Sequence, residues 1–297
     1  MKEAINTQSI GKKLMSYKKH PGSFLLLLLV LASAVLTVGV LLYLIAYILI
    51  HGVPYLTPDL FAPEYNSDNV SLVPALVNTI FMTVLALLIA VPLGIGAAIY
   101  LAEYAKRGNR LVRLIRLMAE TLQGIPSIIY GLFGMLFFVT ALKIGYSLLA
   151  GAATLAIMVL PVVMRTTEEA LLSVPDMYRE GSFGLGAGKL RTIFKIVLPS
   201  AVPGILAGVI LAIGRIVGES AALLFTAGSG YLLPKAGGWL SKILQPGGTL
   251  TIQLYLSSSK AEYNVAFGIA FVLLVIVLCI NFLTKYLAKR FDVTRMK

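Results

Sequence analysis

The sequence predicts an all-α membrane protein with six transmembrane helices, and three observations support this prediction. Of the 297 residues, 58% are hydrophobic and 13% are charged, with a mean hydropathy of +0.89, whereas a soluble domain carries roughly a quarter charged residues. The apolar residues form runs of about 20 or more, long enough to cross about 30 Å of hydrocarbon as helices. The basic residues lie in alternate loops between these runs. Together these features exclude a soluble globular domain.

The first apolar run, residues 24–50, contains no charged residue. It is longer than the core of a signal peptide, and no small-residue cleavage site closes it neatly, so we expect it to remain as the first transmembrane helix. The five later runs cover residues 72–101, 119–142, 144–164, 200–226 and 263–284. These five runs are expected to form one core unit over residues 72–287.

The placement of the basic residues predicts how the chain is oriented in the membrane. Five Lys or Arg residues lie in each of four segments, which are the tail at 1–23, the loops at 102–118 and 165–199, and the C-terminal segment from residue 285. Cytoplasmic loops are enriched in these residues, so both termini, including the tail at 288–297, are expected in the cytoplasm of a bacterial or archaeal cell. The net charge of +12 is then explained by the lipid bilayer, and no nucleic-acid partner is expected.

The densest basic cluster lies between the second and third runs. It consists of Lys106, Arg107, Arg110, Arg113 and Arg116. We interpret it as a surface helix that contacts anionic lipid headgroups. A nucleic-acid site or a lipid-specific site is the alternative interpretation.

Small residues at intervals of four predict where the helices pack closely, because helices in lipid approach one another through small side chains. Three such ridges are Ala86, Ala90, Gly94 and Ala98; Gly204, Gly208 and Ala212; and Gly214, Gly218 and Ala222. Two prolines, Pro92 and Pro126, are expected to interrupt helical hydrogen bonding, which fits a transporter with broken helices.

Arg215 and Glu219 are the charged pair that most needs an explanation, because the stretch around them is otherwise uncharged. A spacing of four predicts that both side chains lie on one helical face. A charge at this depth usually faces the protein interior or an aqueous path. A pathway for an anion, with the arginine fork as its contact, and a structural salt bridge are the two interpretations.

The loop at 165–199 is too long for a simple connection. Its glycine-rich segment around Gly184 lacks the spacing of a phosphate-binding P-loop, so we expect any ATP hydrolysis to belong to another subunit. Pro175 and Asp176 are expected to open a short helix that ends at Gly186 or Gly188. Such a helix between two spans is suited to docking in a groove of a partner. Neither a catalytic nucleophile with its base nor a metal-ligand cluster is found, which argues against an enzyme or a metal site.

The same loop resembles the permease subunits of binding-protein-dependent ABC importers. The family signature is Glu-Ala-Ala, three residues, Gly, nine residues, Ile, one residue and Leu-Pro. The matching residues are Glu180, Gly181, Ser182, Gly186, Ile196, Leu198 and Pro199, with two alanines replaced by Gly181 and Ser182. Within that family the chain is similar to the PstA-type permeases of the phosphate-specific importer, on the segments at 91–104, 124–134 and 215–228.

The resemblance implies the type I ABC importer permease fold and a non-catalytic role in ATP-driven phosphate import. It implies that Glu180, Gly181, Ser182, Gly186 and Ala187 couple the chain to an ATPase, and that Arg215 lies on the phosphate path. The implied partners are a homologous PstC-type permease, two PstB-type ATPases that use ATP and Mg²⁺, and an external PstS-type phosphate-binding protein. No cofactor is expected on this chain itself. Importers of molybdate, sulfate or an organic solute remain the alternative, and an ion channel is a more distant one.

Overall fold

The computed structural model describes residues 21–66, 69–106, 108–231, 233 and 238–290. Residues 1–20 of the predicted tail at 1–23, residues 291–297 of the predicted tail at 288–297, and Arg107 of the basic cluster lie outside these residues. Every regular element within the described ranges is helical. The all-α prediction is therefore confirmed for the described chain.

Five helical segments are long and apolar enough to span a membrane. They correspond to α2 (Pro21–Gly52), α3 (Val73–Ile99), α6 (Leu148–Leu172), α9 (Leu198–Val217) and α13 (Tyr263–Arg290). A sixth span is possible if two bent helices are counted together. This agrees with the six predicted spans, although two of them differ from the prediction in form.

The predicted span at 119–142 is broken rather than straight. Its first part is α4 (Arg110–Gln123). Its second part is α5 (Ser127–Gly134) with the π-helical turn η4 (Met135–Ala141), and the helix axis bends by 101° between the two parts. Pro126 has no N–H and disfavours helical backbone in the residue before it, so the chain leaves the α4 axis here. Pro92 has no such effect, since α3 continues through it to Ile99.

The predicted span at 200–226 begins earlier and ends earlier than expected. Its helical segment starts at α8 (Lys189–Thr192), continues through the π-helical turn η5 (Ile193–Val197) and ends with α9 at Val217. Pro199 lies at the start of α9 and Pro203 inside it. Each lacks the N–H of a regular helical bond, and the π-helical turn η5 lies directly before them. After Val217 the chain turns and forms only the short helix α10 (Ala221–Leu224).

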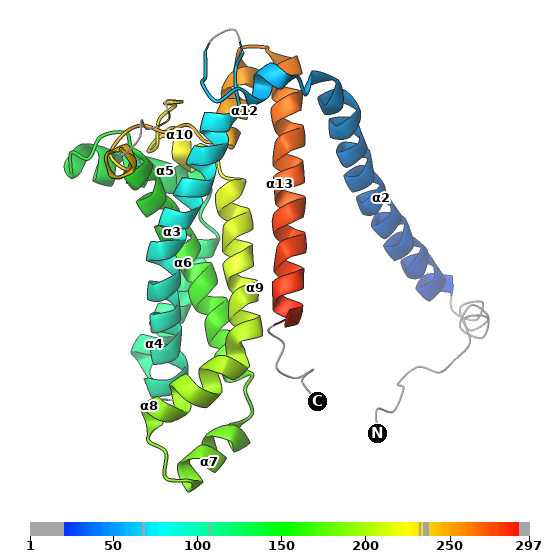
Figure 1. The fold of residues 1–297 in the computed structure, drawn as a ribbon. Coiled ribbons are helices and arrows are strands. Elements are labelled where there is room, and N and C mark those ends of the chain that lie inside the picture. The colour runs from blue at the N-terminus through cyan, green and yellow to red at the C-terminus, as the bar shows by residue number, and fades with distance from the viewer. Residues whose placement is uncertain (1–20, 67–68, 107, 232, 234–237, 291–297) are drawn as a thin grey trace.

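Helix α6 is the centre of the bundle and packs against both α3 and α9 (Figure 1). A Cβ atom placed on Gly94 would lie 2.9 Å from Val163 Cγ1, and one on Gly208 would overlap the Thr166 hydroxyl. Ala86, Ala90 and Ala98 are fully buried. The first two predicted ridges are thus confirmed as close helix contacts. The third is wrong, because Gly214 and Gly218 are exposed and α9 ends before Ala222.

Helix α2 lies apart from the bundle, and its apolar residues are exposed along its length (Figure 1). It contacts α13 near its C-terminal end, where a Cβ on Gly52 would lie 2.7 Å from the Phe267 carbonyl oxygen. The start of α2 and the end of α13 lie at the same end of the molecule as the short helix α7 (Asp176–Gly184). We call this end the α7 end, and the opposite end, which carries α12 (Leu250–Ser259), the α12 end.

Candidate functional site

The candidate site begins with α7, which projects beyond the bundle between α6 and α8 (Figure 1). Pro175 precedes it with extended backbone angles, and Asp176 supplies a carboxylate to its first turn, where the helix dipole favours negative charge. The predicted opening of a short helix is confirmed. The long loop expected at 165–199 is shorter than predicted, because α6 continues to Leu172 and α8 begins at Lys189.

Helix α7 ends in a Schellman motif centred on Gly186. The Gly186 N–H donates to the Phe183 carbonyl at 2.9 Å, and the Ala187 N–H donates to the Ser182 carbonyl at 3.1 Å. Gly186 has a φ of +81°, a conformation that glycine adopts without the steric cost paid by other residues. The signature glycine is therefore required by the backbone, and it, rather than Gly188, ends the helix.

The two signature positions that depart from alanine have different surroundings. Ser182 is buried, and its Oγ lies 2.8 Å from the Thr192 Oγ1 in α8. Gly181 is exposed, and a Cβ placed on it would have no atom within 4 Å. Glu180 is exposed as well. Ser182 thus ties α7 to α8, whereas Gly181 and Glu180 are exposed.

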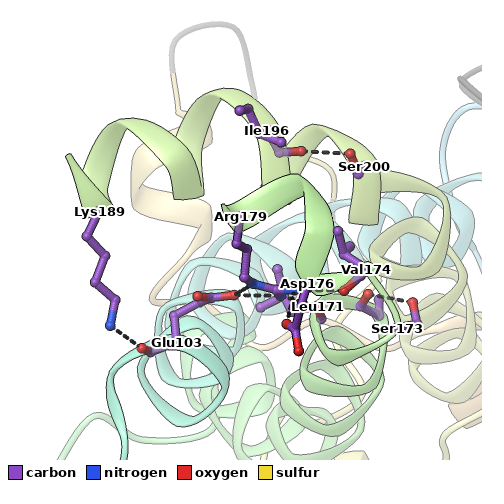
Figure 2. A network of polar contacts seen from close by, with 10 residues as sticks. Glu103, Leu171, Ser173, Val174, Asp176, Arg179, Lys189, Ile196 and Ser200 are labelled. Atoms are coloured by element: carbon purple, nitrogen blue, oxygen red, sulfur yellow. Dashed lines mark hydrogen bonds and ion pairs between the residues drawn. The ribbon is translucent and has the colours of Figure 1, made fainter. Parts of the chain in front are cut away.

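An ionic cluster that was not predicted from sequence joins α7 to the end of the second span. Figure 2 shows Arg179 reaching Glu103 in η3 (Tyr100–Tyr104), the π-helical turn that follows α3. The Arg179 Nη2 donates to Glu103 Oε1 at 2.8 Å, and Nε donates to the same oxygen at 3.1 Å. Their side chains are 14% and 8% exposed. This partly buried pair holds the helix against the bundle.

The same arginine closes the end of α6. Its Nη1 donates to the Val174 carbonyl at 2.7 Å and its Nη2 to the Leu171 carbonyl at 2.8 Å. Lys189, at the start of α8, donates to the Glu103 carbonyl and lies 4.6 Å from the Tyr104 ring centroid. We call Glu103, Arg179 and Lys189 the latch. A signal for it exists in the sequence, since Glu103 is the only carboxylate between Asp68 and Glu120.

A second ion pair lies beside the latch. Arg116 Nε of α4 donates to Glu168 Oε1 of α6 at 2.7 Å, and Glu168 is 2% exposed. Arg116 is therefore directed to a buried carboxylate, which corrects the prediction that the basic cluster faces only lipid headgroups. Arg110 and Arg113 of the same helix are exposed.

Arg215 and Glu219 do not lie on one helical face, contrary to the prediction. Helix α9 ends at Val217, and no ion pair joins these two residues. The buried Glu219 Oε1 accepts from the Ala222 N–H at 3.1 Å, and its carbonyl accepts from the Thr251 hydroxyl at 2.7 Å. Its carboxylate thus orders the turn after α9.

Arg215 lies in the last turn of α9 and is half-buried. In α5, the Tyr130 hydroxyl donates to the Leu122 carbonyl of α4 at 2.7 Å. The Arg215 guanidinium makes no ion pair with a carboxylate of the described chain. Arg215 is therefore a half-buried cation without a carboxylate partner among the described residues, and α10, which follows the end of α9, packs against α5 of the broken span.

No group of three or more His, Cys, Asp or Glu side chains in the described ranges is placed to hold a metal ion. The ion pairs found at the α7 end each bring an arginine to one or two carboxylates. Ionic contacts between arginines and carboxylates therefore join the elements at this end.

Comparisons with known proteins agree with this geometry. The family model for the binding-protein-dependent transport system inner membrane component matches residues 90–293. A probable ABC transporter permease of Bacillus subtilis, YqgI, is 39% identical over 197 residues, which are 66% of this chain and 67% of the relative. The phosphate transport system permease protein PstA of Haemophilus influenzae is 34% identical over 280 residues, covering 93% of this chain and 96% of the relative.

A solved structure shares the fold. A chain of a bacterial alginate ABC transporter, solved in complex with an alginate pentasaccharide-bound periplasmic protein, superposes with a TM-score of 0.67 at 16% identity, covering 93% of this chain and 98% of that chain. This confirms the predicted type I importer permease fold, and the relatives confirm the predicted resemblance to PstA-type permeases. The chain belongs to the family of binding-protein-dependent transport system inner membrane components.

Proposed function

We propose that this chain is a transmembrane permease subunit of an ATP-driven importer for inorganic phosphate. The observation that carries the proposal is α7, a short helix of signature spacing held beyond the bundle by the latch. Such a helix transmits a partner's movement to the spans that hold it. The phosphate transport permease from Haemophilus influenzae, which matches nearly the whole chain, supports phosphate as the cargo.

The proposed transporter contains a homologous PstC-type permease, two PstB-type ATPases and an external PstS-type binding protein. ATP and Mg²⁺ are used by the ATPases, and the present chain is not an enzyme. Glu180, Gly181, Gly186 and Ala187 form the surface that docks on an ATPase, and the buried Ser182 holds this surface against α8 through Thr192. Closure of the ATPases moves α7, and rocking of the bundle then alternates access to the path.

The proposed orientation places the α7 end in the cytoplasm of a bacterial or archaeal cell, with both termini on that side. Exposed basic residues at this end support the assignment, because cytoplasmic segments are enriched in Lys and Arg. They include Lys106, Arg110, Arg113, Lys189 and Arg191.

Arg215 is the proposed contact for phosphate along the path. A guanidinium stays charged at any working pH and offers several donors to an oxyanion. Its lack of an ion pair with Glu219 leaves these donors available. Glu219 then acts by holding the turn after α9 through Ala222 and Thr251, beside the path.

Uptake by the reconstituted transporter tests the proposal. Vesicles containing this chain with its ATPase, second permease and binding protein should accumulate phosphate in preference to sulfate and molybdate when ATP is present. Arg215→Gln should abolish most of this uptake while the complex still co-purifies. Lys260→Gln, which changes an exposed cation near the α12 end, is the matched control and should leave uptake unchanged.

Uptake of sulfate, molybdate or an organic solute without phosphate would refute the phosphate assignment and leave the permease role in place. Normal phosphate uptake by Arg215→Gln would remove Arg215 from the path. No ATP-dependent uptake of any solute by a fully assembled complex would count against the importer itself.

A further inference from the structure

A cavity of about 660 Å³ lies at the α7 end, between the turn that follows α3 and the start of α4. It is not the docking face of α7, whose residues line a different hollow. Its polar and charged lining residues are Glu103, Lys106, Asn109, Arg113, Arg116, Asp176 and Arg179. The volume falls within the range of small-molecule sites, about 300–1,000 Å³.

The lining has an excess of positive charge. Among the described lining residues there are four cations, Lys106, Arg113, Arg116 and Arg179, and two carboxylates, Glu103 and Asp176. Arg116 is neutralised from behind by Glu168, and Arg179 by both lining carboxylates. Arg113 and Lys106 form no ion pair with any carboxylate of the described chain.

The described residues next to these two cations make defined turn and capping contacts. The Asn109 N–H donates to the Lys106 carbonyl at 3.2 Å, and Gly108 turns the chain with a φ of +86°. The Asn109 side chain then accepts from the Leu111 N–H at 2.9 Å and caps α4. The Lys106 carbonyl thus accepts from the residue that caps α4, and Arg113 follows that cap at the end of the first turn of the helix.

We propose that this cavity binds a phosphate group. Arg113 and Lys106 contact its oxygens, and Arg179 contacts it in competition with Glu103. A phosphate group carries several oxygens that accept hydrogen bonds from guanidinium and ammonium donors. Bound there, it competes with Glu103 for Arg179. The phosphate group belongs either to free inorganic phosphate or to the headgroup of an anionic lipid.

The competition gives the site a consequence for α7. Arg179 holds α7 to η3 through Glu103, so a ligand that draws Arg179 away loosens the latch. By linkage, any state in which the latch is broken binds the phosphate group more tightly. The effect on ATP hydrolysis rests on the proposed importer function, whereas binding to the cavity does not.

Binding is tested on the full chain in nanodiscs of neutral phosphatidylcholine, with radiolabelled inorganic phosphate as the probe. Arg113→Gln should weaken binding about tenfold, since one charge-assisted contact is lost. Arg110→Gln is the matched control, because Arg110 is an exposed cation of the same helix that does not line the cavity. It should change binding less than twofold.

Glu103→Gln should strengthen phosphate binding, and it tests the proposal even if Arg113→Gln does not fold. It removes the competing charge without changing the shape of the side chain, so phosphate should bind several-fold more tightly. Phosphate bound at any other place, including the transport path, responds to neither change at the cavity.

The lipid source is tested in nanodiscs that contain phosphatidic acid. If a headgroup fills the cavity, phosphatidic acid should raise the thermal unfolding midpoint of the unaltered chain and of Arg110→Gln, but not that of Arg113→Gln. Dependence on Arg113 in either the phosphate or the phosphatidic acid experiment supports the site and identifies the source. Equal behaviour of Arg113→Gln and Arg110→Gln in both experiments would overturn it.

A last measurement separates this inference from the proposed function. In the assembled transporter, the favoured ligand should lower ATP hydrolysis with the wild-type cavity and have less effect with Arg113→Gln. If phosphate uptake fails but Arg113-dependent binding persists, the cavity stands and the importer assignment falls. If phosphate uptake holds while the Arg113→Gln and Arg110→Gln variants bind phosphate alike, the importer assignment stands and the cavity proposal falls.

Discussion

The two ends of the molecule are held together by different chemistry. At the α7 end, segments far apart in sequence are joined by ion pairs, such as Arg179 with Glu103. At the α12 end, neutral side chains join them: the Asn78 amide donates to the Gly230 and Gly248 carbonyls at 3.2 and 3.1 Å. Even the buried Lys242 there donates to the Pro246 carbonyl, and burial lowers the pKa of its amine.

The difference indicates at which end the contacts between helices can be exchanged for contacts with a ligand. An arginine can exchange one oxyanion for another, so contacts such as Arg179 with Glu103 can be replaced by a ligand. A buried amide that donates to two backbone carbonyls has no such substitute, because breaking it leaves those carbonyls unsatisfied. We therefore expect movement at the α7 end and rigidity at the α12 end.

The largest expected effect is that of Arg179→Ala. The change leaves the Glu103 carboxylate partly buried without its partner and uncovers two carbonyls at the end of α6, which should cost about 3 kcal/mol of stability. Thermal unfolding in detergent measures the loss, and uptake should fall with it. The control is Arg191→Ala, an exposed arginine of α8, and equal stability of the two variants would contradict a structural role for the latch.

Asn78→Ala should have the next largest effect, about 2 kcal/mol, because two backbone carbonyls lose their donor. The cost should be the same in 0.1 M and 1 M salt, whereas that of Arg179→Ala should shrink as salt screens the ion pair. Asn281→Ala removes only an exposed contact to the Val277 carbonyl and serves as the control. A salt-dependent cost for Asn78→Ala would break the contrast between the ends.

Gly186→Ala tests whether the Schellman motif at the end of α7, as well as the latch, holds this helix in position. A Cβ at φ +81° should cost about 1 kcal/mol and weaken co-purification with the ATPase. Gly188→Ala is matched, since its φ is −73° and its Cβ would meet no atom within 4 Å. Comparable binding of both variants to the ATPase would show that the Schellman motif does not position the docking surface.

Gly181→Ala should have the smallest effect and the opposite sign. The position is exposed and helical, and alanine lowers the entropy of the unfolded chain, so stability should rise by about 0.5–1 kcal/mol. Hydrogen exchange of the α7 amides is the measurement. Faster exchange, or a loss of ATPase binding without a stability change, would show that the open face of Gly181 is needed by the partner.

The sequence by itself determined the membrane class, the approximate spans and two of the three small-residue ridges. These depend on local composition, since a run of 20 apolar residues or a small residue at every fourth position acts through one helix. Pro175 and Asp176 also predicted the start of α7, and the glycines limited its end to Gly186 or Gly188, because helix ends depend on neighbouring residues.

The tertiary structure decided which charges meet. Glu103 and Arg179 are 76 residues apart and Arg116 and Glu168 are 52 apart, so no helical period connects them. The structure also separated Arg215 from Glu219, whose spacing of four implied a shared face, because α9 ends at Val217 before the second residue is reached. Spacing predicts a contact only where one helix carries both residues; otherwise the packing of the spans decides it.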